Sequence, residues 1–263
     1  MKPSFKILVF LSGILLSISG CSGINYNTLT GKENLTFISE EKEVKLGKKL
    51  SRRVEEEYEI IQDPRVKDIV KETGYKLIEK CDRKGIVYYF EAIKRKKDND
   101  KEEPNAFALP GGYIYINDKL LNLISQDSKD EIAAILAHEI SHIVLRHNIL
   151  RLQEAIGMQA LLVVIGITAD DASTLGKSNL ALILLMLAYT KEREMEADRL
   201  ALRYMQNAGY DPRAMISVFE KIREYQFSSP IRAYHIKTHP YMDERIEAIE
   251  REISTGELFK NSN

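Results

Sequence analysis

The sequence predicts an α+β fold that is mainly helical and contains a small β-sheet. Apolar residues recur about every 3.6 residues, the period of a helix, along 39–61, 128–147 and 191–207. Between the first two stretches, residues 86–93 and 112–116 are rich in β-branched and aromatic side chains, which is typical of strands. No internal repeat is visible, so we expect one domain without an appended solenoid.

The amino-terminal elements begin with the helix predicted over 39–61. Asp63 is a favoured N-cap and Pro64 fits the first helical turn, so a second helix is expected to run from here toward Cys81. A charged insert, residues 94–103, separates the two segments of the small sheet. Cys81 has no histidine close to it in the sequence, which favours packing over thiol chemistry.

The carboxy-terminal half is predicted to be helical, starting with 128–147. Two apolar runs follow, 156–169 and 180–189, and each is shorter than the roughly 20 residues that a membrane-spanning helix needs. A buried helical pair and a membrane-facing hairpin both remain open for these runs. Further helices are expected over 191–207 and over 211–225, the second one capped by an Asp-Pro pair.

The composition describes a globular protein. The 263 residues are 44% apolar and 29% charged, which suits one domain with a substantial core. The formal net charge is −1, and this balance gives no indication of a nucleic-acid partner. We expect the folded domain to cover residues 38–263.

The first twenty residues form a separate unit. Lys2 and Lys6 precede the apolar run 7–18, and small residues follow it. This pattern is typical of a secretory signal, and the run is too short to span a membrane comfortably. We therefore expect residues 1–20 to be a signal peptide that is removed.

Residues 18–21, Ile-Ser-Gly-Cys, resemble a bacterial lipobox. In such a motif the cysteine thiol is acylated before cleavage, so Cys21 is expected to anchor the protein to a membrane. Residues 21–37 would then be a lipidated tether, and Cys81 would have no partner for an intrachain disulfide. In a bacterium with two membranes, Ser22, rather than aspartate, favours the outer membrane, with the protein facing the periplasm; with one membrane this inference does not apply. The alternatives are an ordinary signal peptide or an uncleaved anchor.

The pattern with the most specific chemistry is His-Glu-Ile-Ser-His at residues 138–142. Histidines at i and i+4 share one face of a helix, so His138 and His142 can bind one metal ion. Glu139 can act as the general base on a water held by that metal. Zinc lowers the pKa of such a water to about 7 and polarises a scissile carbonyl, so the pattern predicts a zinc hydrolase.

A catalytic zinc site needs a third protein ligand. His147 lies about 180° round the helix from His138, so it cannot share the ion while the helix continues. The metzincin pattern is absent, because it requires glycine at Leu145 and histidine at Asn148. The third ligand is therefore expected to be a carboxylate.

Residues 192–198 offer four carboxylates, and spacing does not choose among Glu192, Glu194, Glu196 and Asp198. Glu194 and Asp198 lie one turn apart on one helix face. One of them can therefore bind zinc while the other accepts a hydrogen bond from a ligand histidine.

These motifs resemble those of the zinc metallopeptidase family that includes HtpX and the CAAX prenyl proteases, and in particular its periplasmic lipoprotein and BepA-like branch, here without TPR repeats. In that family the first glutamate of an ExxAD element completes the metal site, and this element runs from Glu194 to Asp198 here. The resemblance implies a gluzincin domain, with Glu194 as the third ligand of one Zn²⁺ per chain and Asp198 supporting a ligand histidine. Imidazole and carboxylate ligands also accept manganese or cobalt.

The resemblance extends to residues 105–116, which are similar to the family segment forming the edge strand of the active-site cleft. An exposed edge offers unpaired N–H and C=O groups to an extended peptide. A buried hairpin around residues 110–112 is the alternative. The residues expected to bind substrate are Asn105, Ala106, Phe107, Ala108, Gly111 and Gly112.

Residues 238–240, Thr-His-Pro, and 244–246, Glu-Arg-Ile, match the closing element of the family, whose histidine lies near the metal. Two roles stay open for His239, which either stabilises the oxyanion or binds zinc as a fourth ligand in a latent, closed state. Arg245 is expected either to support the same pocket or to be a solvated or paired surface group. His235 has no matching role.

The combined prediction is a zinc metalloendopeptidase that hydrolyses unfolded or misassembled envelope proteins in quality control. The resemblance implies this substrate class, and binding at an edge strand would suit extended, unfolded chains, but no residue specifies a cleavage sequence. The alternative is a periplasmic chaperone or assembly factor that holds clients in the cleft with little proteolysis. A membrane-embedded prenyl-type protease would need spanning helices that the two short apolar runs do not supply.

Overall fold

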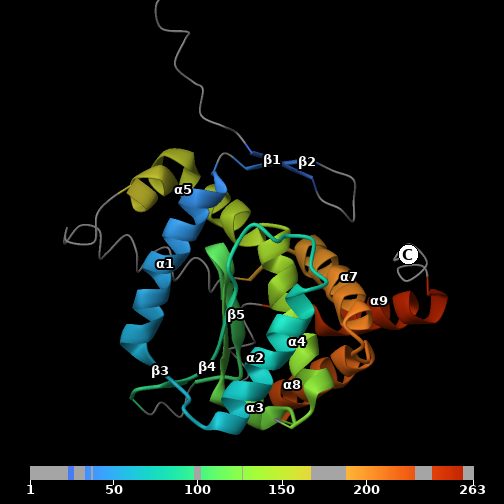
Figure 1. Cartoon of the computed structure of the whole chain (residues 1–263). Coiled ribbons are helices and arrows are strands. Elements are labelled where there is room, and N and C mark those ends of the chain that lie inside the picture. The colour runs from blue at the N-terminus through green and yellow to red at the C-terminus, as the bar shows by residue number, and fades with distance from the viewer. Residues whose placement is uncertain are drawn as a thin grey trace, which may run out of the picture.

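A mixed four-stranded sheet packs between helices (Figure 1). In the computed structural model, the backbone of β1 (Gly23–Tyr26) and β2 (Glu33–Thr36) forms a short antiparallel pair. Beyond this pair, the structure describes residues 38–97, 102–125, 127–166, 188–228 and 239–256, with only the backbone given for 156 and 158–166.

The helices confirm the predicted mainly helical α+β class. Ser39, Asp63, Ser128 and Thr190 cap four of them, each accepting a hydrogen bond from a backbone N–H of the first turn. The described helices are α1 (Glu40–Glu57), α2 (Pro64–Ile78), α3 (Asp118–Leu123), α4 (Lys129–Val144), α5 (His147–Gly166), α7 (Lys191–Asn207), α8 (Ala214–Ser228) and α9 (Met242–Thr255).

The sheet has the strand order β3-β4-β6-β5. Its central pair, β4 (Tyr89–Arg95) and β6 (Tyr113–Asn117), is parallel, and both outer strands run antiparallel to their neighbours. β5 (Ala106–Leu109) is joined to β6 by the 3-10 turn η1 (Pro110–Gly112). The outer strand on the other side is β3 (Tyr58–Ile60).

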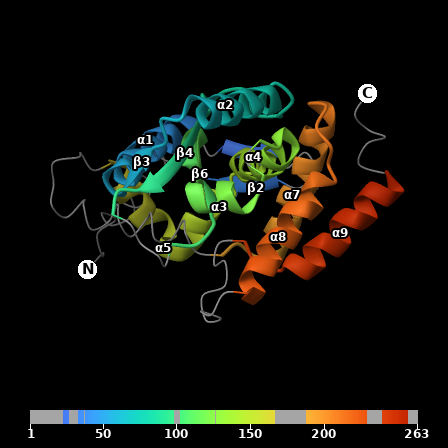
Figure 2. The ribbon, with the colours of Figure 1, turned by 90° about the horizontal axis from the view of Figure 1, so that it is seen from below.

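Successive side chains of a strand point to opposite faces of the sheet. Both faces carry apolar side chains here, and helices cover both. Phe107 and Tyr115 pack with α1 on one face, whereas Ala108 and Ile114 belong to the larger core formed with α2, α4, α7 and α8. Figures 1 and 2 show α4 between the sheet and the C-terminal helices. Nearly all of α4 is buried, including its histidines, so polar groups on this helix need partners inside the protein.

The predicted helix over 39–61 was wrong at its end. α1 stops at Glu57, and Tyr58 adopts extended backbone angles as the first residue of β3. Ile60 pairs with Ile93 of β4, so strand pairing between distant segments overrides the local helical pattern.

The predicted helix over 128–147 was also too long. α4 ends at Val144, and Arg146 has a left-handed backbone with a φ of 56°. A new helix, α5, then starts at His147. The change of direction places His147 beside α4 rather than on the continuation of its helix.

The two apolar runs are only partly described. The first lies mostly in α5, and most of the second, up to residue 187, lies outside the described residues. None of the described helices is both long and apolar enough to span a bilayer.

Candidate metal centre

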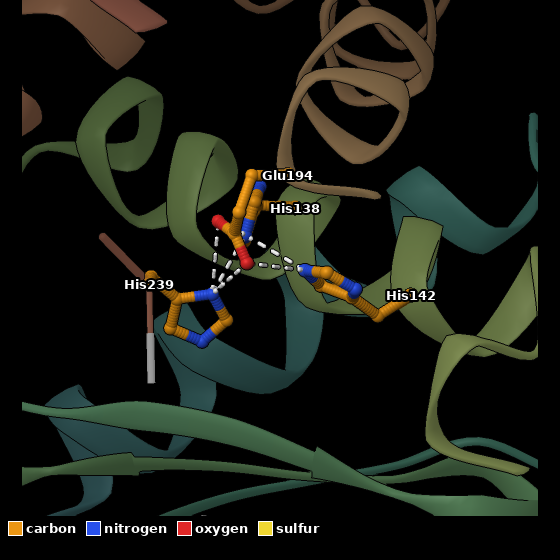
Figure 3. A group of neighbouring side chains, drawn as sticks. All are labelled: His138, His142, Glu194 and His239. Carbon is orange, nitrogen blue, oxygen red and sulfur yellow. Dashed lines mark hydrogen bonds and ion pairs between the residues drawn. The ribbon is translucent and has the colours of Figure 1, made fainter. Parts of the chain in front are cut away.

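Four side chains from separate parts of the chain meet beside α4. His138 and His142 come from α4, Glu194 from the first turn of α7, and His239 from the segment before α9. Each offers one ligand atom, and these atoms all lie within 4.8 Å of one another. Figure 3 shows the four side chains directed toward a common centre.

Two hydrogen-bond partners fix which nitrogen of each α4 histidine faces this centre. His138 Nδ1 lies 2.9 Å from Asp198 Oδ1, and His142 Nδ1 lies 2.9 Å from His147 Nδ1. The Nε2 atoms of His138 and His142 therefore face inward, 3.0 Å apart. Outer hydrogen bonds of this kind orient metal-binding histidines.

The donor set fits zinc. Glu194 lies 3.5 Å from His138 Nε2 and 3.6 Å from His142 Nε2, so two imidazoles and a carboxylate surround one point. Lone pairs directed at one another across about 3 Å inside a protein require a cation or a proton between them. Two histidines and one glutamate also form a known catalytic zinc ligand set.

The charges around the centre favour the metal-binding forms of Glu194 and His142 but the protonated form of His138. Burial opposes ionisation of Glu194, but the Arg245 guanidinium and then His239 hold its pKa well below the usual range. Burial and the neighbouring His138 lower the pKa of His142 well below its usual value. Burial also opposes protonation of His138, yet hydrogen bonds with Asp198 and Glu194 raise its pKa to about 9. A metal ion would displace that proton on binding.

Arg245 and Asp198 support the centre from α9 and α7. Arg245 is fully buried, and its Nε and one terminal nitrogen lie 2.7 Å from the two oxygens of Asp198. Its other terminal nitrogen lies 2.7 Å from Glu194 Oε2. Arg245 is therefore a buried, paired side chain rather than a surface group, and its support of the pocket stays a prediction.

Sequence reasoning missed His147 as a neighbour of the centre. It does not belong to the group of four, but its buried ring joins His142 Nδ1 to Glu196, with Nε2 3.3 Å from Glu196 Oε2. The prediction assumed that the helix continued to His147. The sequence has no glycine or proline there to signal the break.

Glu139 and His239 lie together at the edge of the centre. The Glu139 carboxylate is 2% exposed and lies 3.3 Å from His239 Nε2. The other ring nitrogen of His239 lies 3.1 Å from His138 Nε2 and 3.1 Å from Glu194 Oε1. His239 thus contacts Glu139 as well as His138 and Glu194 in this conformation.

The segment expected to bind substrate is an outer strand of the sheet but is covered. Ala106, Phe107, Ala108 and Leu109 are at most 5% exposed. The side-chain amide of Asn148 donates to the Ala108 carbonyl oxygen at 3.1 Å. Gly111 and Gly112 lie in the buried turn η1, and Asn105 donates its backbone N–H to Asn117 Oδ1 at 2.9 Å. The outer position and the burial are consistent with each of the two alternatives, an edge strand and a buried hairpin.

Tyr189 is a second residue near the centre that the sequence did not indicate. Its ring stacks on His142, with centroids 4.0 Å apart, and the Arg151 guanidinium lies 3.7 Å from the centroid of the same ring. Its hydroxyl donates to Asn148 Oδ1. Tyr189 and Asn148 thus link the metal centre to the outer edge of β5.

Of the remaining residues singled out in the sequence, the structure describes only Cys81. Cys21, the signal region and His235 are outside the described residues. Cys81 is buried, and burial raises the pKa of its thiol, which agrees with a packing role.

Comparison with known proteins decides the family. The model of Peptidase family M48 matches residues 63–253, which include every side chain of the centre. The chain belongs to peptidase family M48. This M48 match confirms the resemblance inferred from the sequence and places the chain among zinc metallopeptidases.

Individual relatives agree with the M48 assignment. The beta-barrel assembly-enhancing protease of Escherichia coli (strain K12) is 25% identical over 214 residues, which cover 78% of this chain and 42% of the relative. The mitochondrial metalloendopeptidase OMA1 of Saccharomyces cerevisiae is 30% identical over 164 residues, covering 60% of this chain and 46% of that protein. The chain thus spans less than half the length of these two M48 relatives.

Proposed function

We propose that this M48 protein is a zinc-dependent endopeptidase of the cell envelope that cleaves unfolded or misassembled proteins. The observation that carries the proposal is the position of Glu139 beside a buried His-His-Glu group that fits zinc. The names of the relatives, a protease that enhances β-barrel assembly and a metalloendopeptidase, support this class of activity.

The proposed roles follow from the geometry. His138, His142 and Glu194 would hold one zinc ion per chain, which supplies Lewis acidity to the scissile carbonyl and to the attacking water. Glu139 takes a proton from that water and delivers it to the leaving amine. Asp198 and Arg245 hold the ring of His138 and the carboxylate of Glu194 in position.

We assign His239 as a fourth zinc ligand in the conformation described, since its Nδ1 lies within 3.1 Å of both His138 and Glu194. A fourth protein donor takes the position that a substrate needs. The change His239→Ala is therefore expected to weaken zinc binding and to speed casein cleavage several-fold. Zinc competition and initial rates measure the two effects. A slower enzyme with unchanged zinc affinity would favour the oxyanion role instead.

His147 is proposed to position His142. The change His147→Ala is expected to weaken zinc binding by about 10- to 100-fold, because His142 loses the partner that fixes its ring. Competition with a chromophoric chelator measures this affinity without any need for catalysis. His147→Asn, whose side-chain oxygen can replace Nδ1 as acceptor, is expected to retain more of it. Equal affinities of parent and His147→Ala would contradict the assignment.

The substrate is proposed to be an extended polypeptide that pairs with β5. Main-chain pairing depends little on sequence, which suits unfolded clients. In this conformation Asn148 already contacts the Ala108 carbonyl, so binding would require that amide to move. Rates on casein and on a tightly folded protein of similar size test this substrate class, and equal rates would argue against it.

The sequence of the first residues supports a proposal for the cellular location. Residues 1–20 would be a signal peptide, 21–37 a tether lipidated at Cys21, and 38–263 the peptidase domain, with Ser22 favouring the outer membrane. The change Cys21→Ser is expected to move the protein out of the membrane fraction and to abolish labelling by a fatty acid. Unchanged fractionation and labelling would contradict the anchor.

A chaperone that cuts rarely is the rival function. A deletion strain complemented with Glu139→Gln separates the two proposals, because this variant should keep client binding while losing hydrolysis. Failure to complement, at normal protein levels, supports the peptidase. Full complementation supports the chaperone.

A further inference from the structure

A pocket opens directly beside the metal centre. His138, Glu139 and His239 form part of its wall, and Arg245 closes it from α9. The remaining wall is mostly apolar and comes from β5, α3, α4 and α8. Its main apolar residues are Ala106, Leu120, Ile135, Val218, Phe219 and Ile222.

The charged groups in this wall already have partners. Arg245 binds Asp198 and Glu194, and its guanidinium lies 4.3 Å from the centroid of the Phe219 ring. Glu139 lies within 3.3 Å of His239. A ligand charge entering the apolar part of the pocket would lose its hydration without gaining an obvious counter-ion, whereas an apolar side chain would lose nothing.

The pocket lies on the side of the metal centre toward which the carboxyl end of a peptide paired with β5 would point. Ile135 lies about one turn before His138 on α4, and Ala106 is the first residue of β5. Antiparallel pairing is the more stable arrangement per residue. A peptide that pairs with β5 in this way points its carboxyl end toward Ala106 and therefore toward the pocket.

We propose that this pocket selects a large apolar side chain at the residue on the carboxyl side of the scissile bond. This inference rests on the proposed peptidase function and names the specificity of the same site. Burial of a leucine or phenylalanine side chain should favour such peptides over those with aspartate at this position by about 10- to 100-fold.

The test compares peptides that differ only at this position, with leucine, phenylalanine, alanine or aspartate. Cleavage sites and rates are measured with the zinc-loaded full-length protein, and affinities are measured with zinc-loaded Glu139→Gln, which should bind the peptides without cutting them. The expected order in both assays is leucine or phenylalanine, then alanine, then aspartate. Equal affinities for the four peptides would overturn the pocket assignment, even if the parent protein cleaves none of them.

A lack of cleavage by the parent would instead overturn the peptidase function, so the two failures are distinguishable. Val218→Phe should fill the pocket and shift the preference toward alanine. Ile216→Phe, on the same helix but outside the pocket wall, is the matched control and should leave the preference unchanged. Ratios between peptides for one protein do not depend on the fraction that is folded, so a poorly folding variant still reports its preference.

Discussion

Replacement of Glu139 by glutamine is expected to slow casein cleavage by about 10²- to 10⁴-fold. The amide keeps the size of the side chain but cannot accept a proton from water. Because Glu139 is not among the four residues that form the candidate metal centre, the variant should retain its zinc and its fold. Initial rates, zinc content and thermal unfolding of the same preparation measure all three properties.

The matched control for this variant is Glu192→Gln, which makes the same chemical change at an exposed position on α7. It should leave the rate unchanged. A Glu139→Gln protein that keeps its zinc and cleaves within about threefold of the parent would show that another group takes the proton.

Replacement of Glu43 by alanine is expected to lower the free energy of unfolding by about 3–5 kcal/mol. The Glu43 carboxylate is 1% exposed and lies 2.9 Å from Arg83 and 2.8 Å from Arg146. It also accepts a hydrogen bond from the backbone N–H of Gly111 at 3.3 Å. Alanine would leave two largely buried guanidinium groups without this carboxylate, which is far more costly than loss of an exposed ion pair.

Denaturant unfolding of the zinc-loaded protein measures this effect. Glu56→Ala is the control, since Glu56 pairs with Arg53 at the surface of the same helix and should contribute less than about 1 kcal/mol. Equal losses in the two variants would show that the buried network stabilises no more than a surface pair.

Glu43 also explains why the centre was only partly predictable from the sequence. The left-handed backbone at Arg146 ends the run of α4, and the Arg146 side chain is held by Glu43 and by the Ile38 carbonyl oxygen. These contacts join residues about a hundred positions apart, so no local pattern could signal the break. The position of His147 follows from that break.

Local signals predicted other parts well. The helix expected over 191–207 matches α7, because its apolar period is regular and Thr190 provides a cap. Spacing placed His138 and His142 on one helix face, and family resemblance selected Glu194 among four carboxylates. The structure brings these three side chains together.

The parts that escaped prediction depend on tertiary contacts. Strand β3 forms because Tyr58 and Ile60 pair with β4, although the sequence around them is helical in character. Burial of Arg245 depends on the packing of α9 against α7 and α8, so the local charge pattern could not choose between the two roles that were open for it. Tyr189 contacts His142 although the two residues are 47 positions apart in the sequence, so no local pattern could indicate the contact.

The central claim is that peptide hydrolysis depends on a metal held by this centre. The most direct test is casein cleavage by the purified protein before metal removal, after chelation, and after stepwise return of zinc. We predict that cleavage disappears with the metal and returns in proportion to zinc, reaching its maximum at about one ion per chain. Cleavage that persists in the metal-free protein, or a zinc-saturated protein that leaves casein intact, would contradict the account.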